Sequence, residues 1–297
     1  MNTIKIIINA HGYADDYEEK VIKQEKIVGK DPVDSQLTEV DLKNALQTII
    51  TSVREIKKLY PDEQADVMYH NDNRLEQIKF QIKINEKDNN SYSLEEESFF
   101  NKVAEYDSLS LLILDYCQVT DNGEEGTRVW IPENDSYVSH PVGTYAILAL
   151  VNQDKKWIPK YIEFLRTNDL DHEVEQMWHI KEIIEKYNWC EETCRLAIAR
   201  NISCCGQEGR QQFRSLMTEG LEEYLKKEEN RTVFFDNVLR EFQEWDAVEF
   251  RLKDGSKKHY LDYVVSNVKK FKTALTENQI NKIEIILLQK WDACHKN

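Results

Sequence analysis

Residues 142–245 carry apolar side chains at the three-, four- and seven-residue spacings of amphipathic helices, and this pattern constrains the fold more than any other feature. Residues at these spacings share one face of a helix, so each helix must bury that face against a neighbour. Asn168 and Asp169 are placed to cap one helix, and Gly206 and Gly209 predict a turn between two later helices. The region therefore predicts several amphipathic helices, joined by short connections and packed as helical hairpins.

The chain before this region has a mixed pattern of short strands and helices. Residues 3–9 are β-branched and apolar and predict a buried strand, whereas residues 75–84 alternate and predict a half-exposed strand. A second strand over residues 65–70 is expected to pair with the latter in antiparallel fashion. Residues 37–59 repeat apolar side chains at helical spacing and predict a long helix. The acidic, polar sequence over residues 15–36 predicts a loop.

Four shorter patterns complete the prediction of secondary structure. The apolar run over residues 109–114, in which Ser110 is the one polar residue, predicts a central strand, and residues 129–131 predict a short one. Residues 93–96 read Ser-Leu-Glu-Glu, which matches a capping box and predicts a short helix through Phe99, Phe100 and Val103. Residues 276–279 read Thr-Glu-Asn-Gln, and we expect them to open the last helix of the chain in the same way.

These patterns together predict an α+β protein. Residues 1–141 form a mixed α/β region with a small sheet, and residues 142–297 form a stacked α-helical block of helical hairpins. The change near residue 141 is a change of pattern without a Gly- or Pro-rich linker, so we expect the two regions to share a core.

The charge balance restricts the partners that the chain can bind. With 54 acidic and 39 basic residues the formal net charge is −15, which disfavours binding to nucleic acid or to anionic membrane lipid. The same charge fits a basic protein partner. The apolar run at the N-terminus is too short for a secretory signal, so the six cysteines are expected to be reduced thiols in the cytoplasm.

One pair of residues suggests hydrolytic chemistry. His11-Gly12 follows one predicted strand, and Asp115-Tyr116-Cys117 follows another. A histidine and a cysteine at neighbouring strand ends can act as a general base and a thiolate nucleophile. This layout resembles that of caspase-type peptidases, and the resemblance covers only these few residues. It implies a Cys-His hydrolase with His11 and Cys117 as the catalytic pair, which is our alternative to a binding function.

Two further groups have the residue types of metal sites. Cys190, Cys194, Cys204 and Cys205 are one zinc candidate, to which His172 and His179 add further ligands. The carboxylates of the second group suit magnesium; they are Asp15, Asp16, Glu18, Glu19 and Asp115. Cysteines on an apolar helical face are more often small core residues, and a chain this acidic produces such carboxylate groups by chance. We therefore expect no metal and no cofactor.

The sequence contains no Gly-rich phosphate loop, no Gly-x-Ser-x-Gly and no His-Glu-x-x-His motif, which favours a binding protein over an enzyme. The leading hypothesis is a cytoplasmic acidic protein that binds a basic protein, as an inhibitor or immunity protein neutralising a toxin or nuclease does. The expected contacts are acidic residues near helix starts and one tryptophan between two helices. They are Asp171, Glu173, Trp189, Glu191 and Glu192.

Overall fold

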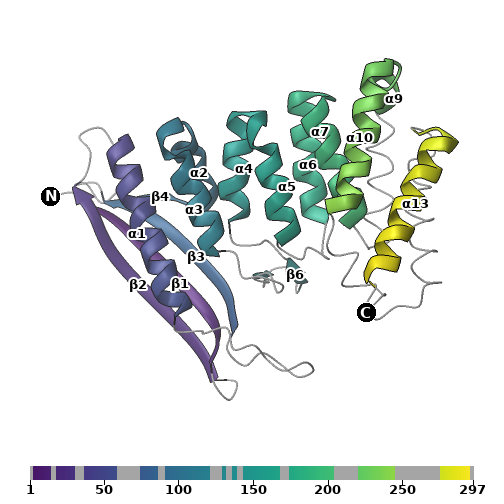
Figure 1. Ribbon diagram of the computed structural model, residues 1–297. Helices are drawn as coiled ribbons and strands as arrows, with labels where there is room; N and C mark the ends of the chain where they lie inside the picture. Colours follow the sequence, from purple (N-terminus) through teal and green to yellow (C-terminus); the bar gives the residue numbers. More distant parts are fainter. Residues whose placement is uncertain are drawn as a thin grey trace. The chain divides into compact units, whose positions relative to one another are not determined.

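A computed structural model shows an α+β chain (Figure 1). The structure describes residues 3–14, 18–30, 37–58, 74–85, 91–120, 129–131, 136–138, 143–167, 174–203, 220–244 and 275–294. The chain divides into two compact units, Met1–His172 and Glu173–Asn297. The predicted boundary at residue 141 lies inside the first unit. It marks where the helical sequence pattern begins, and as a domain boundary it stays a prediction.

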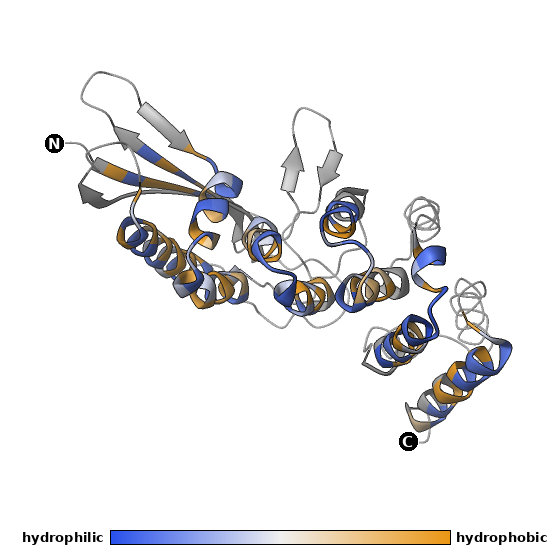
Figure 2. Cartoon of the chain, turned by 90° about the horizontal axis from the view of Figure 1, so that it is seen from above, coloured by the Kyte–Doolittle hydropathy of each residue, from blue (hydrophilic) through white to orange (hydrophobic). Residues whose placement is uncertain are grey.

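A four-stranded antiparallel sheet opens the first unit, with the strand order β2-β1-β3-β4. The strands are β1 (Thr3–Ala14), β2 (Glu18–Lys30), β3 (Arg74–Asn85) and β4 (Ser91–Leu94). Alternation along β1 sets the two faces, because Ile4, Ile6 and Ile8 are buried while Asn9 is exposed. Bands of hydrophobic and hydrophilic residues alternate along the sheet in Figure 2. One face of the sheet therefore carries the core.

Helix α1 (Glu39–Lys57) packs against β1, β2 and β3 on this face. Its first turn is closed by a capping box, in which the Thr38 hydroxyl accepts from the Asp41 amide and the Asp41 carboxylate accepts from the Thr38 amide. Helices α2 (Glu96–Ala104) and α3 (Ser110–Thr120), joined by the 3₁₀ turn η1 (Asp107–Leu109), pack beside α1.

An aromatic cluster joins the sheet to α2 and α3. Phe80 of β3 lies edge-on to Phe99, Phe100 and Tyr116, with ring centroids 5.6, 5.8 and 6.1 Å apart. These geometries are the favourable ones for aromatic pairs. Phe99, Phe100 and Tyr116 are each 0 % exposed, so the cluster is the centre of the core of the first unit.

The first unit continues through a short hairpin and two more helices. The hairpin pairs β5 (Val129–Ile131) with β6 (Ser136–Val138). Helix α4 (Thr144–Gln153) packs on α2 and α3, and the turn η3 (Lys155–Trp157) leads from α4 into α5 (Ile158–Thr167), which packs on α4.

The second unit is helical in its described part. It contains α6 (Val174–Tyr187), α7 (Glu191–Ser203), the short α9 (Leu221–Tyr224), α10 (Glu228–Glu244) and α13 (Glu277–Cys294). Helix α7 contacts both α6 and α10, and α10 also contacts α13. The hydroxyl of Thr276 accepts from the amide of Gln279 at the start of α13, which confirms the predicted capping box. Among the described helices, none combines the length and the apolar composition that a membrane span requires.

Several predicted elements are confirmed and three are wrong. The strands over 3–9, 75–84 and 129–131 and the helix over 37–59 are present. The predicted central strand over 109–114 is wrong, because Leu109 ends η1 and residues 110–114 begin α3. Part of the predicted loop over 15–36 is instead β2. The predicted capping box at 93–96 is wrong, because Glu95 starts α2 without a side-chain cap, but the short helix expected after it is present as α2. The predicted strand over 65–70 and the features at 168–169, 206 and 209 lie outside the described residues.

Candidate functional site

The structure places the two residues of the predicted catalytic pair on different kinds of element. His11 lies in β1, where its backbone pairs in register with Val21 of β2 and Gln77 of β3, and its side chain lies outside the described residues. Cys117 lies on α3 and not at the end of a strand, so the strand-end geometry inferred for it is wrong. Whether the two residues act together stays a prediction.

The surroundings of Cys117 are those of a structural thiol. Its side chain is 7 % exposed, and the thiol donates a long 3.8 Å hydrogen bond to the carbonyl of Gly143. Burial raises the pKa of Cys117 well above the usual value of a thiol. A cysteine nucleophile requires a lowered pKa, because the thiolate is the reactive form. These properties do not favour nucleophilic chemistry at Cys117.

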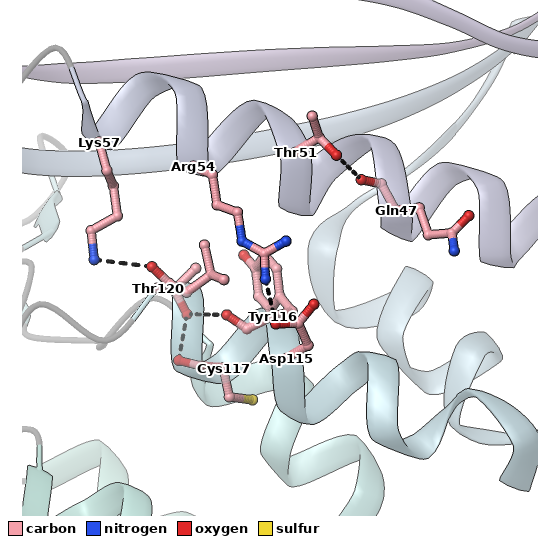
Figure 3. A network of polar contacts seen from close by, with 9 residues as sticks. Gln47, Thr51, Arg54, Lys57, Asp115, Tyr116, Cys117 and Thr120 are labelled. Carbon is pink, nitrogen blue, oxygen red and sulfur yellow. Dashed lines mark hydrogen bonds and ion pairs between the residues drawn. The ribbon is translucent and has the colours of Figure 1, made fainter.

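Polar contacts near Cys117 hold α1 against α3 (Figure 3). Arg54 pairs with Asp115 at 2.6 Å, and the ammonium of Lys57 donates to the carbonyl of Val119 at 3.0 Å. The hydroxyl of Thr120 donates to the carbonyl of Tyr116 at 2.9 Å. Asp115, a predicted magnesium ligand, therefore serves an ion pair between helices at a half-exposed position, where such a pair contributes little to stability.

The cysteines offer a direct test of this description. In the folded protein, an alkylating reagent is expected to label Cys190, which is half-buried, at least ~10-fold faster than the buried Cys117 and Cys194. Peptide-level mass spectrometry over a time course measures the three rates separately. Fast labelling of Cys117 at neutral pH would contradict its burial and would favour the hydrolase hypothesis.

The second set of predicted residues surrounds the junction between α6 and α7. Asn188 takes a left-handed conformation there, with φ of 58°, and lets the chain reverse direction. The buried hydroxyl of Thr193 donates to the Asn188 carbonyl at 2.8 Å and accepts from the Cys190 amide at 2.9 Å. These bonds fix the start of α7 and the position of Trp189 between the two helices.

Trp189 is half-buried, and part of its indole ring lies against the backbone of Gly220 at the start of α9. A Cβ atom at Gly220 would lie 3.1 Å from both Cδ1 and Nε1 of the ring. Gly220 also has a φ of +74°, so this position favours glycine for two independent reasons. The contact brings the start of α9 next to the start of α7.

Tyr224 supplies a second aromatic residue at the same place. Its backbone amide donates to the carbonyl of Gly220 at 3.0 Å, one helical turn earlier. Burial raises the pKa of Tyr224, and the neighbouring Cys194, Cys190 and Glu191 raise it further. Burial likewise raises the pKa of Cys194 to about 12.

Acidic residues occupy the first turns of both helices that meet here. Glu191 and Glu192 begin α7, while Glu222 and Glu223 lie in α9. Carboxylates at these positions interact favourably with the positive end of the helix dipole. Glu223 also pairs with Lys226, a contact between two exposed side chains. We use "the Trp189 patch" for one set of residues: Trp189, Glu191, Glu192, Glu222, Glu223 and Tyr224.

The structure brings together three of the five predicted partner-binding residues. Trp189, Glu191 and Glu192 belong to the Trp189 patch, whereas Asp171 and Glu173 lie outside the described residues. Sequence reasoning missed the three members from α9, because only tertiary contact brings α9 beside Trp189. The acidic first turn of α9 is a local signal for a helix start, but it carries no information about its neighbour.

Among the described residues, no group of three or more His, Cys, Asp or Glu side chains has the arrangement of a metal site. Cys190 and Cys194 lie one helical turn apart, and the other two cysteines of the zinc candidate lie outside the described residues. His179 is also described and does not join these two cysteines in such a group, whereas His172 lies outside the described residues.

Comparison of the chain with protein-family models, curated proteins and solved structures finds no significant match. The function proposed below rests on the residues of the Trp189 patch and on the charge of the chain.

Proposed function

We propose that this protein binds a basic protein partner through the Trp189 patch and neutralises it, as an inhibitor or immunity protein neutralises a toxin or nuclease. The observation that supports the proposal most is the position of two half-buried aromatic side chains, Trp189 and Tyr224, among the acidic first turns of α7 and α9. Tryptophan and tyrosine are the residue types most enriched among those that contribute most of the binding energy at protein interfaces.

The acidic residues around these aromatics have a separate role in the proposal. Exposed carboxylates at the edge of an interface attract an oppositely charged partner before contact and accelerate association. The formal net charge of −15 adds a long-range field of the same sign. A basic partner would therefore be captured quickly at low ionic strength, and the aromatic side chains would slow its release.

The proposal is tested by reversing charge on the patch. In a pull-down at low and high ionic strength, the wild-type chain is expected to retain a basic protein whose capture falls as salt rises. With that protein purified, Glu191→Lys combined with Glu222→Lys is expected to lower the association rate on the order of tenfold. Both carboxylates are exposed, so the variant should keep its fold. Stopped-flow fluorescence or surface plasmon resonance measures the rate.

A matched control makes the same change of charge in the first unit. Glu97→Lys combined with Glu105→Lys alters two exposed residues at the two ends of α2. If the two double variants slow association equally, net charge alone steers the partner and the Trp189 patch is not the binding site. A partner that is acidic, or whose capture ignores salt, would contradict the proposal as a whole.

A further inference from the structure

Strand β2 is an edge of the four-stranded sheet and is one of its longest strands. It has 13 residues, Glu18–Lys30, and within the described part of the chain it pairs with β1 alone. An edge strand presents a row of backbone amide and carbonyl groups that can pair with another strand. Such an edge is either blocked against pairing or pairs with another strand, and the residues of β2 favour pairing.

The register of β2 against β1 determines which of its residues share a face. Ile22, Gln24 and Lys26 pair with Ala10, Ile8 and Ile6, whose side chains face the helices. Residues 21, 23, 25 and 27 therefore belong to the opposite face. The register shifts by one residue at Val28, so regular strand geometry covers residues 21–27.

On the face away from the helices, the order of residues in this regular segment is complementary to itself when it is read in the opposite direction. In an antiparallel pair of two copies centred on Gln24, Lys23 of each copy stands opposite Glu25 of the other, and Val21 stands opposite Ile27. Because the pairing is symmetric, each of these matches occurs twice. Opposite charges and paired apolar residues are the cross-strand combinations that stabilise an antiparallel sheet.

We propose that two copies of this chain associate by antiparallel pairing of β2 with β2 about a twofold axis at Gln24. The two sheets then form one continuous sheet, with the helices of both copies on the same side of it. An isologous contact of this kind closes as a dimer and leaves neither β2 edge open to further addition. The recognition mode is strand addition at a sheet edge, in which the backbone supplies affinity and the side chains select the register.

Neighbouring registers are disfavoured by the same charges. A shift of the axis to Lys23 places that lysine opposite itself, and it also places Lys20 opposite Lys26. A shift to Glu25 places two glutamates opposite each other at the axis. Like charges directly opposite one another destabilise a sheet. The pairing centred on Gln24 is therefore the one that the sequence of β2 selects among these three.

Two charge-reversal variants test this pairing and its register together. Lys23→Glu alone places two carboxylates opposite each other in both symmetric 23–25 pairs. Glu25→Lys alone places two ammonium groups opposite each other in the same pairs. Each variant is therefore expected to dimerise at least ~10-fold more weakly than wild type. A mixture of the two variants restores both attractive pairs and is expected to form a heterodimer. Sedimentation velocity over a concentration series measures all three samples, and the wild-type chain is expected to show a concentration-dependent dimer.

The control reverses charge on α2, at the exposed Lys102 and Glu105. Lys102→Glu and Glu105→Lys are expected to dimerise as the wild type does, alone or mixed. A wild-type chain that stays monomeric at the highest concentration overturns the proposal. A dimer that is unaffected by Lys23→Glu and Glu25→Lys also overturns it, because the contact then lies elsewhere.

A cross-linking measurement keeps the proposal testable if the charge variants fold poorly. Gln24→Cys places two cysteines opposite each other at the proposed axis, within the range of a disulfide bond. Mild oxidation is expected to give a covalent dimer beyond the wild-type background, whereas Lys26→Cys gives none because each Lys26 stands opposite Ile22. Equal cross-linking of the two variants contradicts the register, and cross-linking of neither contradicts the dimer.

Discussion

Replacement of Phe100 by alanine is expected to lower the free energy of unfolding by about 3–5 kcal/mol. Phe100 is 0 % exposed, and its ring lies 5.4 Å from that of Phe99 and 4.8 Å from that of Tyr116. With Phe80 of β3 also in contact, the side chain joins the sheet to two helices. A cavity there removes contacts on three sides, and the rigid surroundings cannot close it. Urea unfolding followed by circular dichroism measures the loss.

Leu111→Ala is the matched control for this prediction. Leu111 lies on α3, close in sequence to Tyr116, but its side chain is 76 % exposed. Its truncation is expected to change the free energy of unfolding by less than about 0.5 kcal/mol, as surface substitutions do. Similar losses for Phe100→Ala and Leu111→Ala would mean that the aromatic cluster is not the centre of the core.

The position of Leu111 also explains why the sequence misled the prediction for α3. Residues 109–114 are apolar except for Ser110, and a run of this length fits a buried strand and a buried helix equally well. In the structure the helix continues to Thr120 and exposes Leu111. Local pattern could not separate the two possibilities, because the contacts that decide between them come from α1, α2 and α4.

Strand β2 was missed for a different reason. Its residues are charged on both faces, so they lack the alternation of apolar and polar residues that identifies a half-buried strand. Pairing with β1 forms this strand, and such pairing is non-local information. The half-buried strands β1 and β3 and the capped helix α1 could be predicted, because one-sided burial and capping leave their signals within the segment itself.

The candidate site was predictable in part for the same reason. A tryptophan between two amphipathic segments, followed by two glutamates, identifies Trp189, Glu191 and Glu192 from local sequence alone. Gly220 and Tyr224 are more than a helix away along the chain, and they join the site because Gly220, at the start of α9, contacts Trp189. No local pattern predicts a contact of this kind.

Replacement of Gly143 by alanine is expected to lower the free energy of unfolding by about 2–4 kcal/mol. Gly143 has a φ of +100°, in the region that disfavours residues with a side chain. A Cβ atom there would also lie 2.8 Å from the Thr120 hydroxyl oxygen, a distance too short for a real contact. That hydroxyl is buried and hydrogen-bonded to the carbonyls of Tyr116 and Cys117, so it cannot move aside without losing these bonds. Urea unfolding measures this loss as well.

A double-mutant cycle with Thr120→Ala separates the steric part of this effect from the backbone part. Thr120→Ala alone removes the hydroxyl and is expected to cost about 1 kcal/mol, the usual value of a hydrogen bond. With the hydroxyl absent, Gly143→Ala keeps only the penalty of its positive φ, so the two losses should fall short of additivity by about 0.5–3 kcal/mol. Additive losses would show that no steric conflict exists at Thr120. A coupling in the expected range would establish that the start of α4 is fitted against the end of α3, and that glycine at position 143 sets how closely the two helices approach.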